Sequence, residues 1–149
     1  MLKGINPLLN ADVLYILRQM GHGDDLIIVD TDFPAHSFSK STVHRTPLRI
    51  DASAPEVVKA ILSLMPLDTF VDDAAARMEM DGKPDKILPV MFEVQEEISA
   101  FNGPNPIQSI ERLAFYERAK NAYAIVQTAE VRIYGCFAFR KGIIKPNGE

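Results

Sequence analysis

The chain lacks the features that mark secreted and membrane proteins. Its 149 residues include one cysteine, Cys136, so no internal disulfide can form, which is consistent with a reducing cytosol. No apolar run is long enough to cross a bilayer. The N-terminal segment, residues 1–7, has no apolar stretch of the kind found in signal peptides. We therefore expect a cytoplasmic protein that does not associate with a membrane.

Basic residues and cofactor motifs are also scarce. Lys and Arg number 16 against 20 Asp and Glu, which gives a formal net charge of −4. Because no surplus of positive charge is available to neutralise phosphates, nucleic acid is not the expected partner. The sequence contains no phosphate loop, dinucleotide fingerprint, nucleophile elbow or pair of cysteines. These absences argue against cofactor chemistry.

The residues that are present fit one globular domain spanning 1–149. Apolar residues make up 47% and charged residues 24% of the chain, which are ordinary values for such a domain. Periodicity and capping signals predict helices over residues 11–20, 54–65, 88–101 and 112–121. Asn10 is the expected N-cap of the first helix and Gly21 its expected left-handed terminator, and Ser53 and Glu56 form a capping box at the start of the second. They predict strands over residues 26–29, 42–46, 74–80, 107–110, 123–128 and 133–140. Strands that alternate with helices indicate a layered α/β domain, here with a mixed sheet.

Two polar residues bracket the most apolar predicted strand, residues 26–29. His22 lies between two glycines after the first helix, where an imidazole suits general acid–base work or simply caps that helix. Asp30 ends the strand, and ligands of open α/β sheets gather at the carboxyl ends of strands. Its carboxylate therefore either accepts hydrogen bonds from substrate hydroxyls, orients His22, or caps a loop.

Other candidates lie elsewhere in the chain. An alternative hypothesis is a metal site formed by His22, Asp30, Asp32 and His36, although their spacing matches no standard pattern. Arg112 and Tyr116 are four residues apart and share a helix face, whereas Arg118 is expected to pair with Glu111 or Glu117 or to face solvent. The pair Tyr134–Gly135 either admits a ligand or makes a tight strand entry, and Cys136 reads as a small buried residue.

Several segments in combination resemble the RbsD/FucU family, with the L-fucose mutarotase branch as the closer match. The resemblance runs from residue 2 to about residue 143. It is carried by residues 20–24, 30, 33–37, 112–119, 134–135 and 141–142. It implies a three-layer α/β/α fold with a central mixed sheet, and a cyclic homo-oligomer, typically a decameric ring. It also implies interconversion of the anomers of a free sugar without cofactor or metal.

The resemblance assigns roles by motif position. His22 would be the catalytic acid–base residue, and Asp30 and Arg112 would bind sugar hydroxyls. The segment Tyr134, Gly135 and Cys136 would provide the third substrate contact, although the family usually has Asn in place of this cysteine. A thiol lacks the donor and acceptor pair of an amide, so sugar binding should differ at this position. Tyr116 and His36 are further candidate substrate contacts.

The expected function is therefore a sugar mutarotase, with L-fucose as the default monosaccharide. The alternatives are a non-enzymatic monosaccharide-binding accessory of a sugar uptake system, and a pyranase for another sugar such as D-ribose. A metal-dependent isomerase that uses His22, Asp30, Asp32 and His36 is a further rival.

Overall fold

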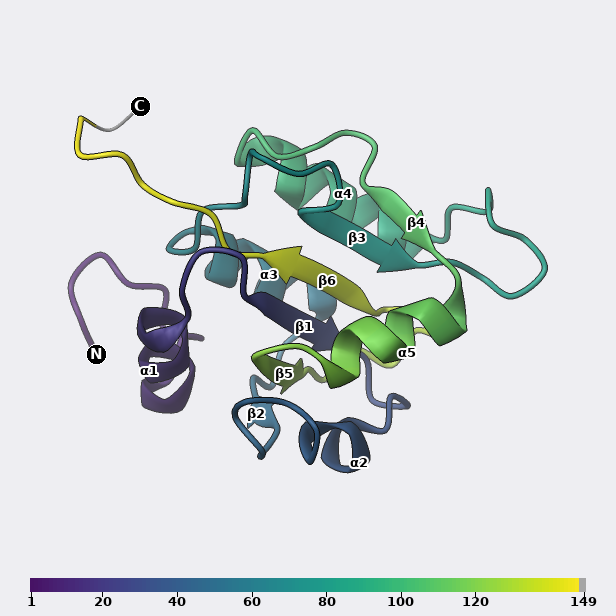
Figure 1. The fold of residues 1–149 in the computed structure, drawn as a ribbon, viewed down its shortest axis with the longest axis horizontal. Coiled ribbons are helices and arrows are strands. Elements are labelled where there is room, and N and C mark those ends of the chain that lie inside the picture. Colours follow the sequence, from purple (N-terminus) through teal and green to yellow (C-terminus); the bar gives the residue numbers. More distant parts are fainter. Residues whose placement is uncertain (148–149) are drawn as a thin grey trace.

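A computed structural model describes residues 1–147, and a six-stranded mixed sheet forms its centre (Figure 1). The strands lie in the order β2-β5-β1-β6-β3-β4. β1 pairs parallel with β5 and antiparallel with β6, and β3 pairs antiparallel with β6 and parallel with β4. The strands are β1 (Asp25–Val29), β2 (Leu48–Arg49), β3 (Ala75–Met78), β4 (Gln108–Ile110), β5 (Ala124–Gln127) and β6 (Phe137–Arg140).

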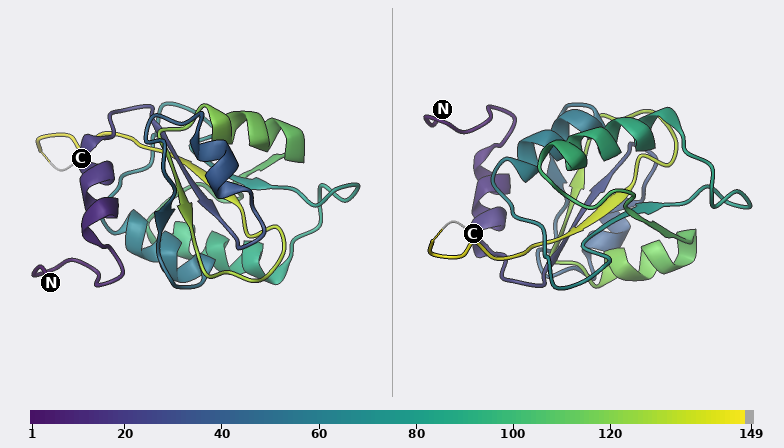
Figure 2. Two further views of the ribbon diagram at one scale, coloured as in Figure 1. Left: turned by 90° about the horizontal axis from the view of Figure 1, so that it is seen from below. Right: turned by 90° about the horizontal axis from the view of Figure 1, so that it is seen from above.

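Helices cover both faces of the sheet, which confirms the predicted three-layer α/β/α architecture (Figure 2). One face packs against α3 and α4, with α1 beside them, and the other face packs against α2 and α5. The helices are α1 (Ala11–Gln19), α2 (Ala35–Ser39), α3 (Ala54–Leu62), α4 (Pro89–Ala100) and α5 (Arg112–Lys120).

The central strand β1 explains why two layers of helix are needed. Successive side chains of a strand point to opposite faces. Leu26 and Ile28 join the core under α3 and α4, whereas Ile27 and Val29 join the core under α2 and α5. All four side chains are fully buried, as expected for a strand that is apolar on both faces.

Local capping signals fix the starts of two helices where the sequence predicted them. The side chain of Asn10 accepts a hydrogen bond from the backbone N–H of Val13 (3.0 Å) and so caps α1. Ser53 and Glu56 form the predicted capping box at the start of α3, where the glutamate accepts the Ser53 N–H at 3.0 Å.

Three local predictions were wrong. Residues 42–46 form no strand, because the Thr42 hydroxyl donates to nearby backbone carbonyls and makes a turn, and β2 begins only at Leu48. The last strand starts at Phe137 rather than at residue 133. The left-handed glycine after α1 is Gly23 (φ +90°) rather than Gly21. The first error placed a strand where a turn lies, whereas the other two misplaced the boundary of an element that does exist.

Within residues 1–147, none of the helices combines the length and the apolar character that crossing a membrane requires.

Candidate functional site

A pocket of about 300 Å³ opens where β1 ends, α5 begins and β6 is entered. Five of the predicted substrate-binding residues line it or form its wall, namely Asp30, Arg112, Tyr116, Tyr134 and Cys136. Asp32, Phe33, Met78 and Ile133 complete the lining. The pocket therefore combines an apolar floor with charged and hydroxyl groups, and its size suits a small polar molecule.

The buried carboxylate of Asp30 organises the wall of this pocket. Its Oδ1 accepts hydrogen bonds from the backbone N–H groups of Asp32 (3.1 Å) and Phe33 (3.0 Å). Its Oδ2 accepts from the N–H of Gly135 (3.0 Å) and the thiol of Cys136 (3.4 Å). Burial raises the pKa of Asp30, and these hydrogen bonds oppose the rise. Because each oxygen already has two donors, the carboxylate holds two loops in register with each other.

Cys136 lines the pocket but is almost fully buried, as the sequence predicted for this small residue. Its thiol donates to Asp30, and burial raises the pKa of Cys136 well above its usual value. The thiol is therefore protonated at neutral pH and acts as a hydrogen-bond donor within the wall.

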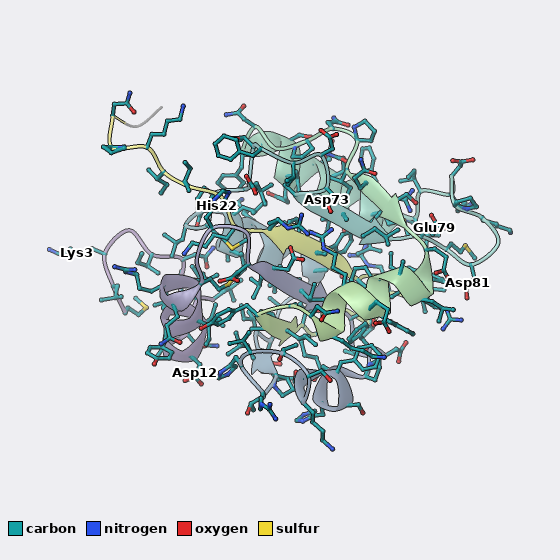
Figure 3. All side chains as sticks on the ribbon, in the orientation of Figure 1. Lys3, Asp12, His22, Asp73, Glu79 and Asp81 are labelled. Carbon is teal, nitrogen blue, oxygen red and sulfur yellow. The ribbon has the colours of Figure 1, made fainter. Side chains whose placement is uncertain are left out.

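Arg112 and Tyr116 lie together at the rim, as their spacing on one helix face predicted. The guanidinium carbon of Arg112 lies 5.5 Å from the centre of the Tyr116 ring. Hydrogen bonding with Tyr116 and with Asp81 raises the pKa of Arg112. Asp81 accepts from Arg112 Nε at 2.9 Å, and its backbone N–H donates to the hydroxyl of Tyr134 at 3.2 Å. The loop after β3 thus contacts Arg112 and Tyr134 through Asp81, which is labelled in Figure 3.

The segment that presents Tyr134 depends on close packing. Tyr134 itself has a left-handed backbone conformation (φ 59°), which an L-residue adopts only when its surroundings impose it. A Cβ atom on Gly135 would lie 2.9 Å from Cγ of Glu130 and 3.2 Å from the carbonyl oxygen of Arg132. Glycine is therefore required at position 135, where the backbone packs closely against Glu130 and Arg132.

Glu130 supports this segment from below. Its side chain is 3% exposed and accepts hydrogen bonds from Nε of Arg132 (2.8 Å) and from the backbone N–H of Ala54 (3.2 Å), the first residue of α3. Arg132 also pairs with Glu93 of α4 (2.9 Å). Hydrogen bonds from Arg132 lower the pKa of Glu130 to about 2.

Acid is therefore expected to destabilise the fold through Glu130. Its pKa is about 2 when folded and about 4.5 when unfolded, so the unfolded chain binds more protons between these values. This pKa difference contributes on the order of 2 kcal/mol to the free energy of unfolding, because solvent at the partly exposed Arg132 screens the pair. The contribution is fully present above pH 4.5 and is lost as pH falls toward 2. Urea unfolding at several pH values should show a steeper decline for the natural chain than for Glu130→Gln, and parallel declines would contradict this assignment.

His22 occupies a different place from the pocket. It lies on the loop between α1 and β1, and its side chain is 45% exposed. Its Nε2 lies 3.1 Å from Oδ2 of Asp68, a carboxylate that is itself 4% exposed. The ring of Phe70 is tilted against the imidazole, with 5.6 Å between ring centres. The turn that carries His22 is closed by a hydrogen bond from the Gly21 N–H to Asp24 (2.7 Å).

The structure separates His22 from Asp30. They flank the two ends of β1, a five-residue strand that is about 16 Å long at about 3.3 Å per residue. Asp30 therefore does not orient His22 within one chain, which corrects that expectation. Figure 3 shows that His22 also lies far from Asp81, the partner of Arg112.

The residues of the metal hypothesis also lie apart. His22 is at the other end of β1, and His36 is exposed on α2 without lining the pocket. Across residues 1–147 there is no group of three or more His, Cys, Asp or Glu side chains that could hold a metal ion. The placement of His36 also gives no support to its predicted contact with substrate.

Two residues that contact the predicted site residues, Asp68 and Asp81, were not predicted. Asp68 pairs with His22 and Asp81 pairs with Arg112, but each lies far from its partner along the chain. Only the hydrogen bonding of segment 67–68 to the end of β6 brings Asp68 beside the His22 loop. No periodic or spacing signal marks such a pair.

Similarity to known proteins extends over nearly the whole chain. Residues 3–144 match the family described as the RbsD / FucU transport protein family. The chain is 40% identical over 153 residues to the fucose mutarotase of Danio rerio, covering 97% of this chain and 95% of that protein. It is 38% identical over 152 residues to the fucose mutarotase of Homo sapiens, with coverage of 98% and 96%.

Solved structures give the same relationship. The fucose mutarotase of Streptococcus pneumoniae, crystallised in complex with L-fucose, is 33% identical and superposes with a TM-score of 0.87. That superposition covers 97% of this chain and 100% of the other. The resemblance noted in the sequence is thereby confirmed, and the chain belongs to the RbsD / FucU family.

Proposed function

We propose that the chain is a mutarotase that interconverts the α and β anomers of a free aldose, with L-fucose as its substrate. The observation that supports this most strongly is the full-length similarity to proteins named fucose mutarotase. The pocket at the end of β1 adds physical support, because it gathers an arginine, two tyrosines and a buried carboxylate around a space of about 300 Å³.

The chemistry needs only proton transfer. A pyranose opens when its anomeric hydroxyl loses a proton, the bond between C1 and the ring oxygen breaks, and that oxygen gains a proton. The open aldehyde then rotates about its C1–C2 bond, and the hydroxyl adds back to the opposite face. One imidazole can take the first proton and deliver it to the ring oxygen, which makes His22 the acid–base residue of the proposal.

The pocket residues supply binding in this scheme. Arg112 offers donors to sugar hydroxyls, and the hydroxyl groups of Tyr116 and Tyr134 can donate or accept. Asp30, with Gly135 and Cys136 as its donors, keeps the wall in shape while C1 turns. No step requires a cofactor or a metal.

A second copy of the chain is needed to complete the site. His22 and the pocket lie at opposite ends of β1, so one sugar cannot contact both within a single chain. In a cyclic assembly, the edge carrying His22 on one copy can face the pocket of the next. The proposal therefore includes a homo-oligomer, namely a decameric ring. It also includes a cytoplasmic location.

The second candidate is a sugar-binding accessory without enzymatic activity. It is favoured by one observation, the description of the matching family as transport proteins. Such a protein would use the same pocket to hold a monosaccharide but would leave its anomer exchange unchanged.

Saturation-transfer NMR on equilibrated sugars separates the two functions. We expect the chain to speed exchange between the anomeric signals of L-fucose, and to do so equally after treatment with a chelator. A panel that includes D-galactose and D-ribose ranks the substrates. Binding of L-fucose with no faster exchange would establish the accessory function instead, and loss of exchange on chelation would revive a metal-dependent isomerase.

A further inference from the structure

A second pocket, of about 740 Å³, lies between α4, β3 and the segment that leads into β4 (Figure 1). It is larger than the pocket at the end of β1 and shares no lining residue with it. Apolar side chains that include Ile87, Phe92 and Ile107 form much of its wall, and Arg77 and Ser99 are among its polar residues. An apolar wall with a few polar groups is typical of a site for a small molecule.

Arg77 is buried at this pocket without a carboxylate to pair with. It is 6% exposed and points to the face of the sheet that α4 covers, since its neighbours Ala76 and Met78 pack in the core under α2 and α5. None of the ion pairs within residues 1–147 includes Arg77. The nearby carboxylate of Glu79 instead accepts the hydroxyl of Ser109 at 2.6 Å. The buried positive charge therefore has no direct counterion in the described chain.

The hydrogen bonds of Arg77 use only part of its guanidinium. Nη2 donates to the carbonyl of Pro84 at 3.0 Å, and Nη1 donates to Sδ of Met91, a weak acceptor, at 3.6 Å. A guanidinium has five N–H groups, so the others have no acceptor within residues 1–147. Burial lowers the pKa of Arg77, although the group remains charged in a protein. Because an unpaired buried charge is costly, we expect its counterion to come from outside the chain.

We propose that this pocket binds a small organic monocarboxylate, whose carboxylate pairs with Arg77 and whose apolar part lies against Phe92 and Ile87. A guanidinium and a carboxylate match as two parallel hydrogen bonds. Ser99 offers a second donor. Its Oγ accepts from Gln95 and Asn105, both at 3.3 Å, and its own O–H has no acceptor among the described residues.

The charges around the pocket favour a single negative charge on the ligand. The lining residues include one cationic side chain, Arg77, and one acidic side chain, Glu96. The charges of Glu79 and Asp85 also act on Arg77. A phosphate monoester, which carries more negative charge, would be repelled by these three carboxylates, whereas a monocarboxylate is neutralised by the one guanidinium.

This inference does not depend on the proposed function. Arg77 faces α4, whereas the next residue of β3, Met78, lines the pocket at the end of β1 on the opposite face of the sheet. A ligand beside Arg77 is therefore separated from the proposed sugar site by the sheet itself. Arg77→Met should leave L-fucose anomer exchange unchanged, so failure of one proposal can be told from failure of the other.

The test titrates the full chain with benzoate, which joins one carboxylate to an apolar ring. Isothermal titration calorimetry at pH 7 compares it with benzamide, a neutral molecule of the same shape, and with phenyl phosphate. We expect benzoate to bind the natural chain, and Arg77→Met to weaken that binding about tenfold to a hundredfold. Benzamide and phenyl phosphate should bind more weakly than benzoate. Arg45→Met is the matched control, because Arg45 is exposed and does not line the pocket, and it should retain the affinity.

A second variant and a spectrum locate the site even if Arg77→Met fails to fold. Phe92 is 57% exposed, so Phe92→Ala should fold normally and bind benzoate more weakly, whereas Phe101→Ala, an exposed aromatic outside this pocket, should not. Benzoate should shift the backbone amide signals of Ser99 and Ile107 but not that of Gly135. Absence of binding up to roughly 10 mM benzoate, equal binding of benzamide, or shifts centred on Gly135 would overturn the proposal.

Discussion

His22→Ala is expected to remove nearly all enzymatic anomer exchange of L-fucose while leaving the fold unchanged. General acid–base catalysis contributes about 10² to 10⁴-fold, and the proposal gives that contribution to this one imidazole. The side chain is 45% exposed and lies on a loop, so its loss should change the free energy of unfolding by less than about 1 kcal/mol. Saturation-transfer NMR measures the exchange rate, and urea unfolding measures the stability.

His44→Ala provides the matched histidine control. His44 does not line the pocket, and its backbone accepts a hydrogen bond from the Thr42 hydroxyl and donates one to the carbonyl of Tyr123. This variant should exchange anomers at the natural rate. An unimpaired rate in His22→Ala would remove His22 from the mechanism and leave the pocket residues as the only source of proton transfer.

Asp30→Asn is expected to have the largest effect on stability. The natural carboxylate accepts four hydrogen bonds, two at each oxygen. An asparagine replaces one of these oxygens with an N–H₂ group, which would face two donors inside a buried site. Leaving buried donors without acceptors costs about 1 to 3 kcal/mol each, so the free energy of unfolding should fall by about 2 to 4 kcal/mol.

Sugar binding should be lost in the same variant, since both loops that form the pocket wall depend on Asp30. Equilibrium unfolding in urea gives the stability, and L-fucose titration followed by NMR gives the affinity. Asp32→Asn is the stability control, because that carboxylate is exposed and should change unfolding by less than about 0.5 kcal/mol. A loss of stability in Asp30→Asn no larger than in this control would show that the four hydrogen bonds contribute little.

Much of the fold followed from local signals. The apolar run at residues 26–29 predicted a doubly covered strand, and Leu26 and Ile27 do face opposite cores. Capping by Asn10 and Ser53 predicted where α1 and α3 begin. These features depend on residues within a few positions of one another, which is why sequence periodicity and capping rules find them.

Features that depend on distant partners could not be found in the same way. The guanidinium of Arg118 was expected to pair locally or with solvent, yet it binds Asp25 through two hydrogen bonds of 2.9 Å across 93 positions. Asp68 meets His22 only because β6 passes between their segments. Spacing along a sequence carries no information on such pairs, since the order of strands in the sheet decides them.

The candidate site shows the same division. Arg112 and Tyr116 share a helix face, and their contact was predicted from spacing alone. Asp30 and Cys136 join this pair in one pocket because the ends of their strands meet at one edge of the sheet. His22 lies at the end of β1 that is farther from this pocket. The sequence does not show how copies of the chain assemble, so it could not predict whether His22 reaches a pocket.

The most direct test of the account is complementation between two inactive variants. His22→Ala removes the acid–base residue, and Arg112→Met removes a binding residue of the pocket. If each site takes His22 from one copy and the pocket from another, co-expressed variants should form about one quarter intact sites in a random one-to-one mixture. We predict that this mixture recovers a corresponding share of L-fucose anomer exchange. A mixed assembly that stays as inactive as its two parents would contradict the shared site.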